Sequence, residues 1–224
     1  MSVTNETRVG KLAAEHPLAT RVFARYGIDF CCGGGRALGE VCREKGLDSD
    51  RVIEEIEREI TKCGGVPEEH WNDAPLGVLI DHILAAYHRP LHEEMRRLEV
   101  MARKVLAVHG EKDPKRFAEL VSVFAALHIE LEEHMAKEEQ ILFPMIRGGQ
   151  GMMAEGPVAV MHEEHEAAGA ALRRLRELTH DYEVPAEACN TWRALWHGLA
   201  AFEDEMHRHI HLENNILFPR ALGA

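Results

Sequence analysis

The sequence has no run of 18 apolar residues, so it predicts no membrane-spanning helix. Its opening stretch, MSVTNETRVG, lacks the basic segment and the apolar segment that together make a secretion signal. Aromatic residues make up only 6 %, and no β-branched run alternates with polar residues as a surface strand would. These absences favour a cytoplasmic, helical protein with no membrane partner.

Cysteine is also scarce, and the positions of the cysteines form no disulfide framework. The residues are Cys31, Cys32, Cys42, Cys63 and Cys189. In a chain without an export signal, an odd and irregular set of this kind predicts reduced thiols. We interpret Cys42, Cys63 and Cys189 as structural residues.

Basic residues are too few to balance the acidic ones, and the imbalance lies in one part of the chain. The net charge is −12, and the chain after residue 65 carries 16 Lys and Arg against 27 Asp and Glu. This surplus argues against nucleic acid as the main partner, because phosphate binding needs a basic surface. All but one of the 15 histidines also follow residue 65. Carboxylates and imidazoles together suit a hard or borderline cation.

Helical periodicity is present on both sides of a segment rich in glycine and proline. Residues 1–65 predict a small helical domain, residues 66–75 are typical of a linker, and residues 76–224 predict an antiparallel four-helix bundle. The short helices of the first part should follow Pro17, Arg36 and Asp48. The long helices should cover about residues 76–109, 115–143, 158–180 and 186–217. The predicted fold class is therefore all-α.

One motif occurs twice, as HMAKEEQILFP at residues 134–144 and as HIHLENNILFP at residues 209–219. Each copy places a glutamate four residues after a histidine, and residues with this spacing lie on the same face of a helix. A single such pair is usually an exposed surface pair. Two copies before the same Ile-Leu-Phe-Pro helix end, on alternate helices of a bundle, predict metal ligands instead. These ligands are His134, Glu138, His209 and Glu213.

The first bundle helix should supply a further ligand, and it offers His82, His88 and His92. His88 lies almost as far before the first loop as His134 lies after it, so the two should sit at the same height in the hairpin. The other two histidines miss this level by several residues. The spacing therefore favours His88.

The third bundle helix offers His162 and His165. The second loop lies midway between Glu138 and His165, which favours His165. The third loop aligns His162 with His209 slightly better. Spacing alone thus does not decide which of the two histidines is the metal ligand, although it favours His165.

Four histidines and two carboxylates are too many ligands for one zinc ion, which takes four. They suit two metal ions bridged by both glutamates and by an oxo or hydroxo group, as in carboxylate-bridged di-iron or di-manganese sites of helical bundles. One position on each ion would stay open for a small ligand such as O2 or NO. Each histidine would need a partner for its second ring nitrogen. Candidate partners are Asp81, Glu130, Glu164 and Asp204, whereas the histidines interpreted as non-ligands are His128, His197, His207 and His211.

The second candidate site is the double cysteine in YGIDFCCGGGRALGEV, residues 26–41. Cys31 and Cys32 precede a glycine turn and a helix N-terminus, with Arg36 close by, and the helix dipole and the guanidinium both favour thiolate over thiol. A thiolate pair could bind or transfer iron, react with nitric oxide or act as a redox couple. Packing in a small core is the alternative.

Five segments in the same order closely resemble the RIC family (repair of iron centres). They are YGIDFCCGG, DHILAAYH, HMAKEEQILFPMI, EEHEAAG and HIHLENNILFPRAL. The resemblance implies a hemerythrin-like bundle behind a small domain with the double cysteine. It also implies a non-haem di-iron protein of the bacterial cytoplasm that restores iron–sulfur clusters damaged by nitrosative and oxidative stress. The family's iron ligands fall on His88, His134, Glu138, His165, His209 and Glu213, with both glutamates bridging, and its cysteine pair falls on Cys31 and Cys32.

Three functions are compatible with these residues. In the leading hypothesis the chain repairs clusters in damaged iron–sulfur proteins, its clients, by supplying iron or handling NO, and the thiolates assist. In the second hypothesis the di-iron site is an enzyme that reduces NO. In the third hypothesis the chain is a sensor module for NO or O2. The long amphipathic helices are also compatible with a homodimer.

Overall fold

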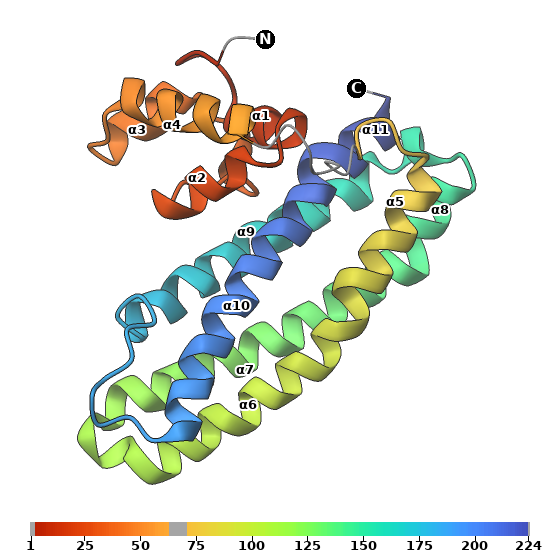
Figure 1. Ribbon diagram of the computed structural model, residues 1–224. Helices are drawn as coiled ribbons and strands as arrows, with labels where there is room; N and C mark the ends of the chain where they lie inside the picture. The colour runs from red at the N-terminus through yellow and green to blue at the C-terminus, as the bar shows by residue number, and fades with distance from the viewer. Residues whose placement is uncertain (1–2, 63–70, 224) are drawn as a thin grey trace. The chain divides into compact units, whose positions relative to one another are not determined.

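The fold of the computed structural model is all-α, as the sequence predicts (Figure 1). The structure describes residues 3–62 and 71–223, and within these ranges no strand occurs beyond one isolated bridge between Arg8 and Ala37. The chain forms two compact units, Ile80–Met206 and a second unit of Met1–Leu79 with His207–Ala224. The domain limits given above, at residues 65 and 75, remain a prediction. Part of the predicted linker, and Cys63 with it, lies outside the described residues.

The unit Ile80–Met206 contains most of the four long helices of the predicted bundle. The first runs through α5 (Leu76–Ile83) and α6 (Arg89–His109), and the second through α7 (Pro114–Lys137) and α8 (Phe143–Arg147). The third is α9 (Glu155–Leu178) and the fourth begins with α10 (Asn190–Leu212). Helix α7 packs against both α6 and α9 (Figure 1).

The core of this unit is built from large aromatic side chains at helical spacing. Phe117 and Trp192 pack with ring centroids 5.2 Å apart, and Phe124 and Phe202 with centroids 5.6 Å apart. Trp196 is buried beside Trp192. Each buried side chain of this size contributes roughly 1.5–3 kcal/mol by leaving water. Both tryptophans therefore belong to the core of this unit.

Two helices that were expected to end before a proline continue past it. The segment that contains α7 reaches Arg147, and the last one continues from α10 into α11 (Phe218–Leu222). A proline inside an α-helix lacks the N–H for the ladder and clashes with the carbonyl four residues back. Here a π-helical turn precedes each proline, Glu138–Leu142 before Pro144 and Glu213–Leu217 before Pro219. The wider turn lets the helix continue, so the expected ends were wrong.

The other unit has its own core beneath four short helices. These are α1 (Val9–Glu15), α2 (Ala19–Arg25), α3 (Leu38–Glu44) and α4 (Ser49–Lys62). The last three confirm the predicted short helices, whereas α1 was not predicted. Gly27 and Gly46 end α2 and α3 with φ of +59° and +66°, a conformation that glycine adopts without strain. Asp48 caps α4 by accepting the N–H of Asp50 at 3.1 Å.

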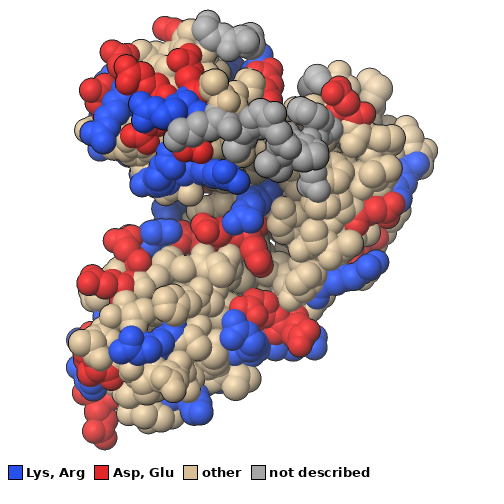
Figure 2. All heavy atoms as spheres, in the orientation of Figure 1, with Lys and Arg blue, Asp and Glu red and all other residues tan. Residues whose placement is uncertain are grey.

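On the face that Figure 2 shows, acidic and basic side chains are interspersed over the described residues. Ion pairs such as Arg97 with Glu94 and Arg103 with Glu99 lie along α6. Within the described part of the chain, no helix is both long and apolar enough to span a bilayer.

Candidate metal centre

Four of the predicted ligands converge inside the unit Ile80–Met206. His88, His134, Glu138 and His165 are 0–3 % exposed. Glu138 Oε2 lies 3.4 Å from His88 Nε2 and also 3.4 Å from His134 Nε2. His165 Nε2 lies 3.0 Å from His134 Nε2. The Glu138 carboxylate thus lies between two sets of imidazole nitrogens, all close enough to bind metal.

Helix geometry explains how Glu138 and His88 reach the same point. His88 is the last residue of the π-helical turn Leu84–His88, and Glu138 is the first residue of the next π-helical turn. Such turns are rare and occur mostly at functional sites. Each one changes the direction of the following side chains without ending the helix. The sequence signal is the His-x-x-x-Glu motif with a proline six residues after its glutamate.

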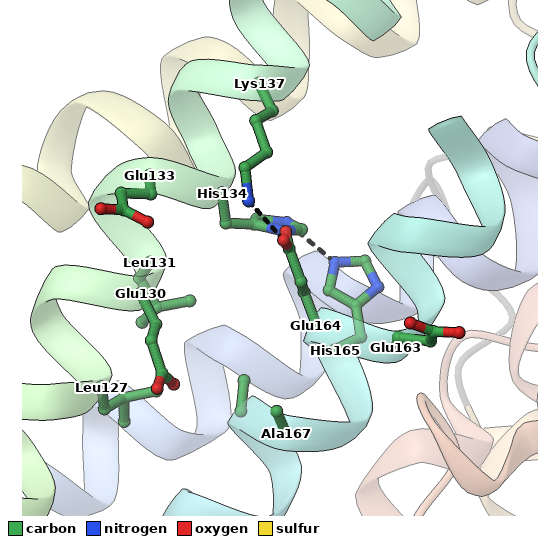
Figure 3. Close-up of a pocket in the computed structure, with 11 residues that line it drawn as sticks. Leu127, Glu130, Leu131, Glu133, His134, Lys137, Glu163, Glu164, His165 and Ala167 are labelled. Atoms are coloured by element: carbon green, nitrogen blue, oxygen red, sulfur yellow. Dashed lines mark hydrogen bonds and ion pairs between the residues drawn. The ribbon is translucent and has the colours of Figure 1, made fainter. Parts of the chain in front are cut away.

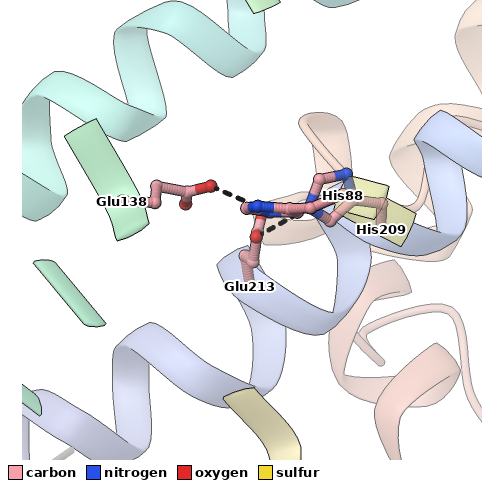
Figure 4. A group of neighbouring side chains, drawn as sticks. All are labelled: His88, Glu138, His209 and Glu213. Carbon is pink, nitrogen blue, oxygen red and sulfur yellow. Dashed lines mark hydrogen bonds and ion pairs between the residues drawn. The ribbon is translucent and has the colours of Figure 1, made fainter. Parts of the chain in front are cut away.

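The second copy of the motif has the same local design. His209 and Glu213 are buried, with Nε2 and Oε1 2.8 Å apart, and Glu213 is the first residue of its own π-helical turn. Figure 4 draws this pair together with the pair formed by His88 and Glu138. Both copies therefore bury a carboxylate beside an imidazole nitrogen.

The buried carboxylate of Glu138 fits a bound cation. Within the described residues, neither of its oxygens has a hydrogen-bond partner, although both are buried. Burial of an ionised carboxylate costs several kcal/mol unless a positive charge compensates. Three nearby imidazoles and one carboxylate are a donor set that iron, manganese or zinc accepts. The His/Glu clusters could therefore hold metal.

Two ligand histidines are oriented by carboxylates through their second ring nitrogens. His134 Nδ1 lies 2.9 Å from Glu164 Oε2, and Lys137 also pairs with Glu164. Burial opposes the charged form of Glu164, but the hydrogen bonds from Lys137 and His134 outweigh it and lower the pKa of this carboxyl. His88 Nδ1 lies 2.9 Å from Glu139 Oε1. These contacts fix the ring orientations before metal binds.

Of the predicted partners, Glu164 has this role and Asp81 does not. Asp81 accepts a hydrogen bond from Arg147 at 2.7 Å. Glu139 was not predicted as a partner, because its side chain reaches a histidine on a different helix. Sequence spacing along its own helix carries no signal for such a contact.

A cavity of about 270 Å³ lies beside two of the ligands (Figure 3). His134 and His165 form part of its wall, and Lys137 and Glu164 line it as well. Figure 3 shows the carboxylates of Glu130, Glu133 and Glu163 around the same space. A small molecule or a cation could therefore approach these histidines between α7 and α9.

The double cysteine lies in the other unit, in a turn around Asp29. Cys31 is buried, and its sulfur lies 3.2 Å from Asp29 Oδ1 and 3.8 Å from the sulfur of Cys32. The hydrogen bond with Cys32, burial and the Asp29 charge raise the pKa of the Cys31 thiol well above its usual value. Arg36 pairs with acidic side chains of α3. The guanidinium of Arg36 thus contacts glutamates, and the charged group beside the Cys31 sulfur is Asp29.

Two of the histidines interpreted as non-ligands, and the unfavoured ligand candidate His92, have other contacts. His128 Nδ1 lies 2.6 Å from Glu99, and His92 Nδ1 lies 2.9 Å from Glu132. His211 is buried against Asn215, and desolvation lowers its pKa to about 4. These contacts favour a structural role for all three.

Two protein-family models match the chain. Residues 79–221 match the model of the hemerythrin HHE cation binding domain, and residues 5–59 match the ScdA_N domain, a domain of unknown function. The chain is 43 % identical over 217 residues to the iron–sulfur cluster repair proteins YtfE of Escherichia coli (strain K12 / DH10B) and Shigella boydii (serotype 4). Each alignment covers 96 % of both chains.

Proposed function

The chain belongs to the family of iron–sulfur cluster repair proteins with a hemerythrin HHE domain, and from this membership we propose that it repairs iron–sulfur clusters damaged by oxidative and nitrosative stress. It does so with a buried non-haem di-iron centre, by supplying iron, by handling NO, or both. Its clients are damaged iron–sulfur proteins. The observation that carries the proposal is the buried Glu138 carboxylate between His88 and His134.

We assign six ligands to the di-iron centre. They are His88, His134, Glu138, His165, His209 and Glu213. Glu138 would bridge the two ions, because its carboxylate faces imidazoles from two sides. We infer the same role for Glu213 from the repeated motif, since it too is buried, follows its histidine by four residues and opens a π-helical turn.

The protein residues around these ligands control geometry and access. When bound, the irons supply redox and Lewis-acid chemistry and are also the cargo for a depleted cluster. Glu164 and Glu139 accept hydrogen bonds from the Nδ1 atoms of His134 and His88, which leaves Nε2 of each ring for the metal. The ring of Phe143 packs 5.7 Å from that of His88 and shields it from water. The cavity beside His134 and His165 admits NO or O2.

A matched pair of variants tests the proposal. We expect anaerobically reconstituted protein to hold two irons per chain with a coupled Mössbauer spectrum, and to restore activity to a dehydratase with a nitrosylated cluster. Glu138→Gln keeps the size of the side chain but removes the bridging charge, so iron content and repair should both fall at least several-fold. Glu166→Gln, on the exposed side of α9 and outside the cavity, is the control and should retain both. Wild-type protein that binds no iron would refute the proposal.

A further inference from the structure

We propose that Asp29, Cys31 and Cys32 form a second metal site, which binds one soft or borderline transition-metal ion such as Fe²⁺. Their ligand atoms all lie within 4.8 Å of one another. In a tetrahedral thiolate site with metal–sulfur bonds of about 2.3 Å, two sulfurs lie roughly 3.8 Å apart. The sulfurs of Cys31 and Cys32 are 3.8 Å apart before any metal is bound.

The backbone turn explains how adjacent cysteines present both sulfurs on one side. Asp29 Oδ1 accepts the N–H groups of Cys31 and Cys32, each at 3.0 Å. Cys32 takes a helical conformation with φ of −79° and ψ of −43°, directly before the 3₁₀ turn Gly33–Gly35. In an extended strand, successive side chains would point to opposite faces. The carboxylate thus shapes the turn, and its oxygen lies beside both cysteines.

The turn is also held in place by the C-terminal segment of the same unit. Asn215 Nδ2 donates to the carbonyl of Phe30 at 3.1 Å, and Asn214 Nδ2 donates to the carbonyl of Cys31 at 3.4 Å. Gly34 packs so closely on Asn215 that an added Cβ would lie 2.8 Å from its Oδ1 atom. The three ligand atoms are therefore preorganised, which reduces the entropic cost of binding.

The donor set determines the class of cation and the proton balance. Thiolates select iron, zinc or copper(I) over magnesium or calcium. Binding of a divalent ion by two thiols forms two metal–sulfur bonds and releases two protons, with no change of oxidation state. Cys32 is only half-buried, so solvent or an external ligand can complete the tetrahedron. A site of this kind suits iron in transit to a client.

The inference goes beyond the proposed function, because it uses none of the six His and Glu ligands. The test is a titration with Co²⁺, under anaerobic conditions, of reduced full-length protein that holds two irons per chain, the number that the His/Glu centre takes. Thiolate-to-cobalt charge transfer absorbs in the near ultraviolet, and imidazole and carboxylate ligands give no such band. We expect the band to saturate at one Co²⁺ per chain.

Variants assign the band to these residues. Cys32→Ser should abolish it, and Asp29→Asn should weaken Co²⁺ binding at least several-fold while its amide oxygen still supports the turn. Cys42→Ser and Cys189→Ser, the matched thiol controls, should retain the band. A band that survives Cys32→Ser, or no band in wild-type protein with native circular dichroism, overturns the inference. Iron content and repair are measured on the same samples, so a failure of the His/Glu centre is seen separately from a failure of this site.

Discussion

At the scale of single residues, the carboxylates behind the ligands matter as much as the ligands. Glu164 touches His134 and Lys137, and neither contact requires a metal. Such a residue fixes the tautomer and direction of the imidazole, so that Nδ1 carries the proton and Nε2 is free to bind. The result is a ligand set that is largely in place before iron arrives.

Replacement of Glu164 should therefore weaken iron binding without loss of the fold. We expect Glu164→Gln to lower iron affinity roughly 10- to 100-fold, because a neutral amide holds the imidazole less firmly. Competition with a coloured iron chelator would measure the change. Glu166→Gln, at an exposed position of the same helix outside the cavity, is the control. Equal affinity of the two variants would show that the Glu164 contact does not support the site.

The sequence predicted residue types better than it predicted contacts between helices. Spacing along one helix was enough to pair His134 with Glu138, because both lie on the same helical face. Glu139 was missed because it bonds to a histidine on another helix. Arg36 was expected near Cys31, but two glutamates of α3 bind it instead. Such choices depend on three-dimensional neighbours that local spacing does not encode.

At the scale of secondary structure elements, the three π-helical turns of residues 3–62 and 71–223 are the main departure from the sequence prediction. A proline normally indicates a helix end, and this rule placed helix ends at residues 143 and 217. In the structure the turn before each proline is one residue wider, with the Phe143 N–H bonded to the Glu138 carbonyl and the Phe218 N–H bonded to the Glu213 carbonyl. The helix positions were predictable from periodicity. The π-helical turns were not, because the same residues are compatible with a helix that stops.

The proline should help to keep its π-helical turn. Pro144→Ala restores a backbone N–H that can bond to the carbonyl of Gln140 in an ordinary α-helix. We expect the turn to relax towards α-helix and to move Glu138, so that iron content falls although unfolding free energy changes by less than about 1 kcal/mol. Pro157→Ala, in the first turn of α9, is the control. Unchanged iron content in Pro144→Ala would mean that packing alone maintains the turn.

At the scale of the whole molecule, metal binding and folding should be coupled. Metal that binds only the folded state adds about 2.7 kcal/mol of stability at a free concentration one hundred times its dissociation constant. For a chain of this size, each kcal/mol raises the unfolding midpoint by roughly 2–4 °C. We expect iron loading to raise the midpoint of the wild-type protein by roughly 5–10 °C, and that of Glu138→Gln by much less. Calorimetry of both proteins with and without iron gives the comparison, and equal shifts would contradict the ligand role of Glu138.

The π-helical turns also set limits on which changes of chain length the protein can tolerate. Each turn holds one residue more than an α-helical turn would, directly beside His88, Glu138 or Glu213. Deletion of that residue would leave an unbroken helix but rotate everything beyond it by about 100°. Surface loops tolerate insertions and deletions readily, whereas a change in residue number at any of these turns would misplace a ligand side chain. The number of residues between ligand and proline is thus fixed, although chain length elsewhere in the bundle can vary.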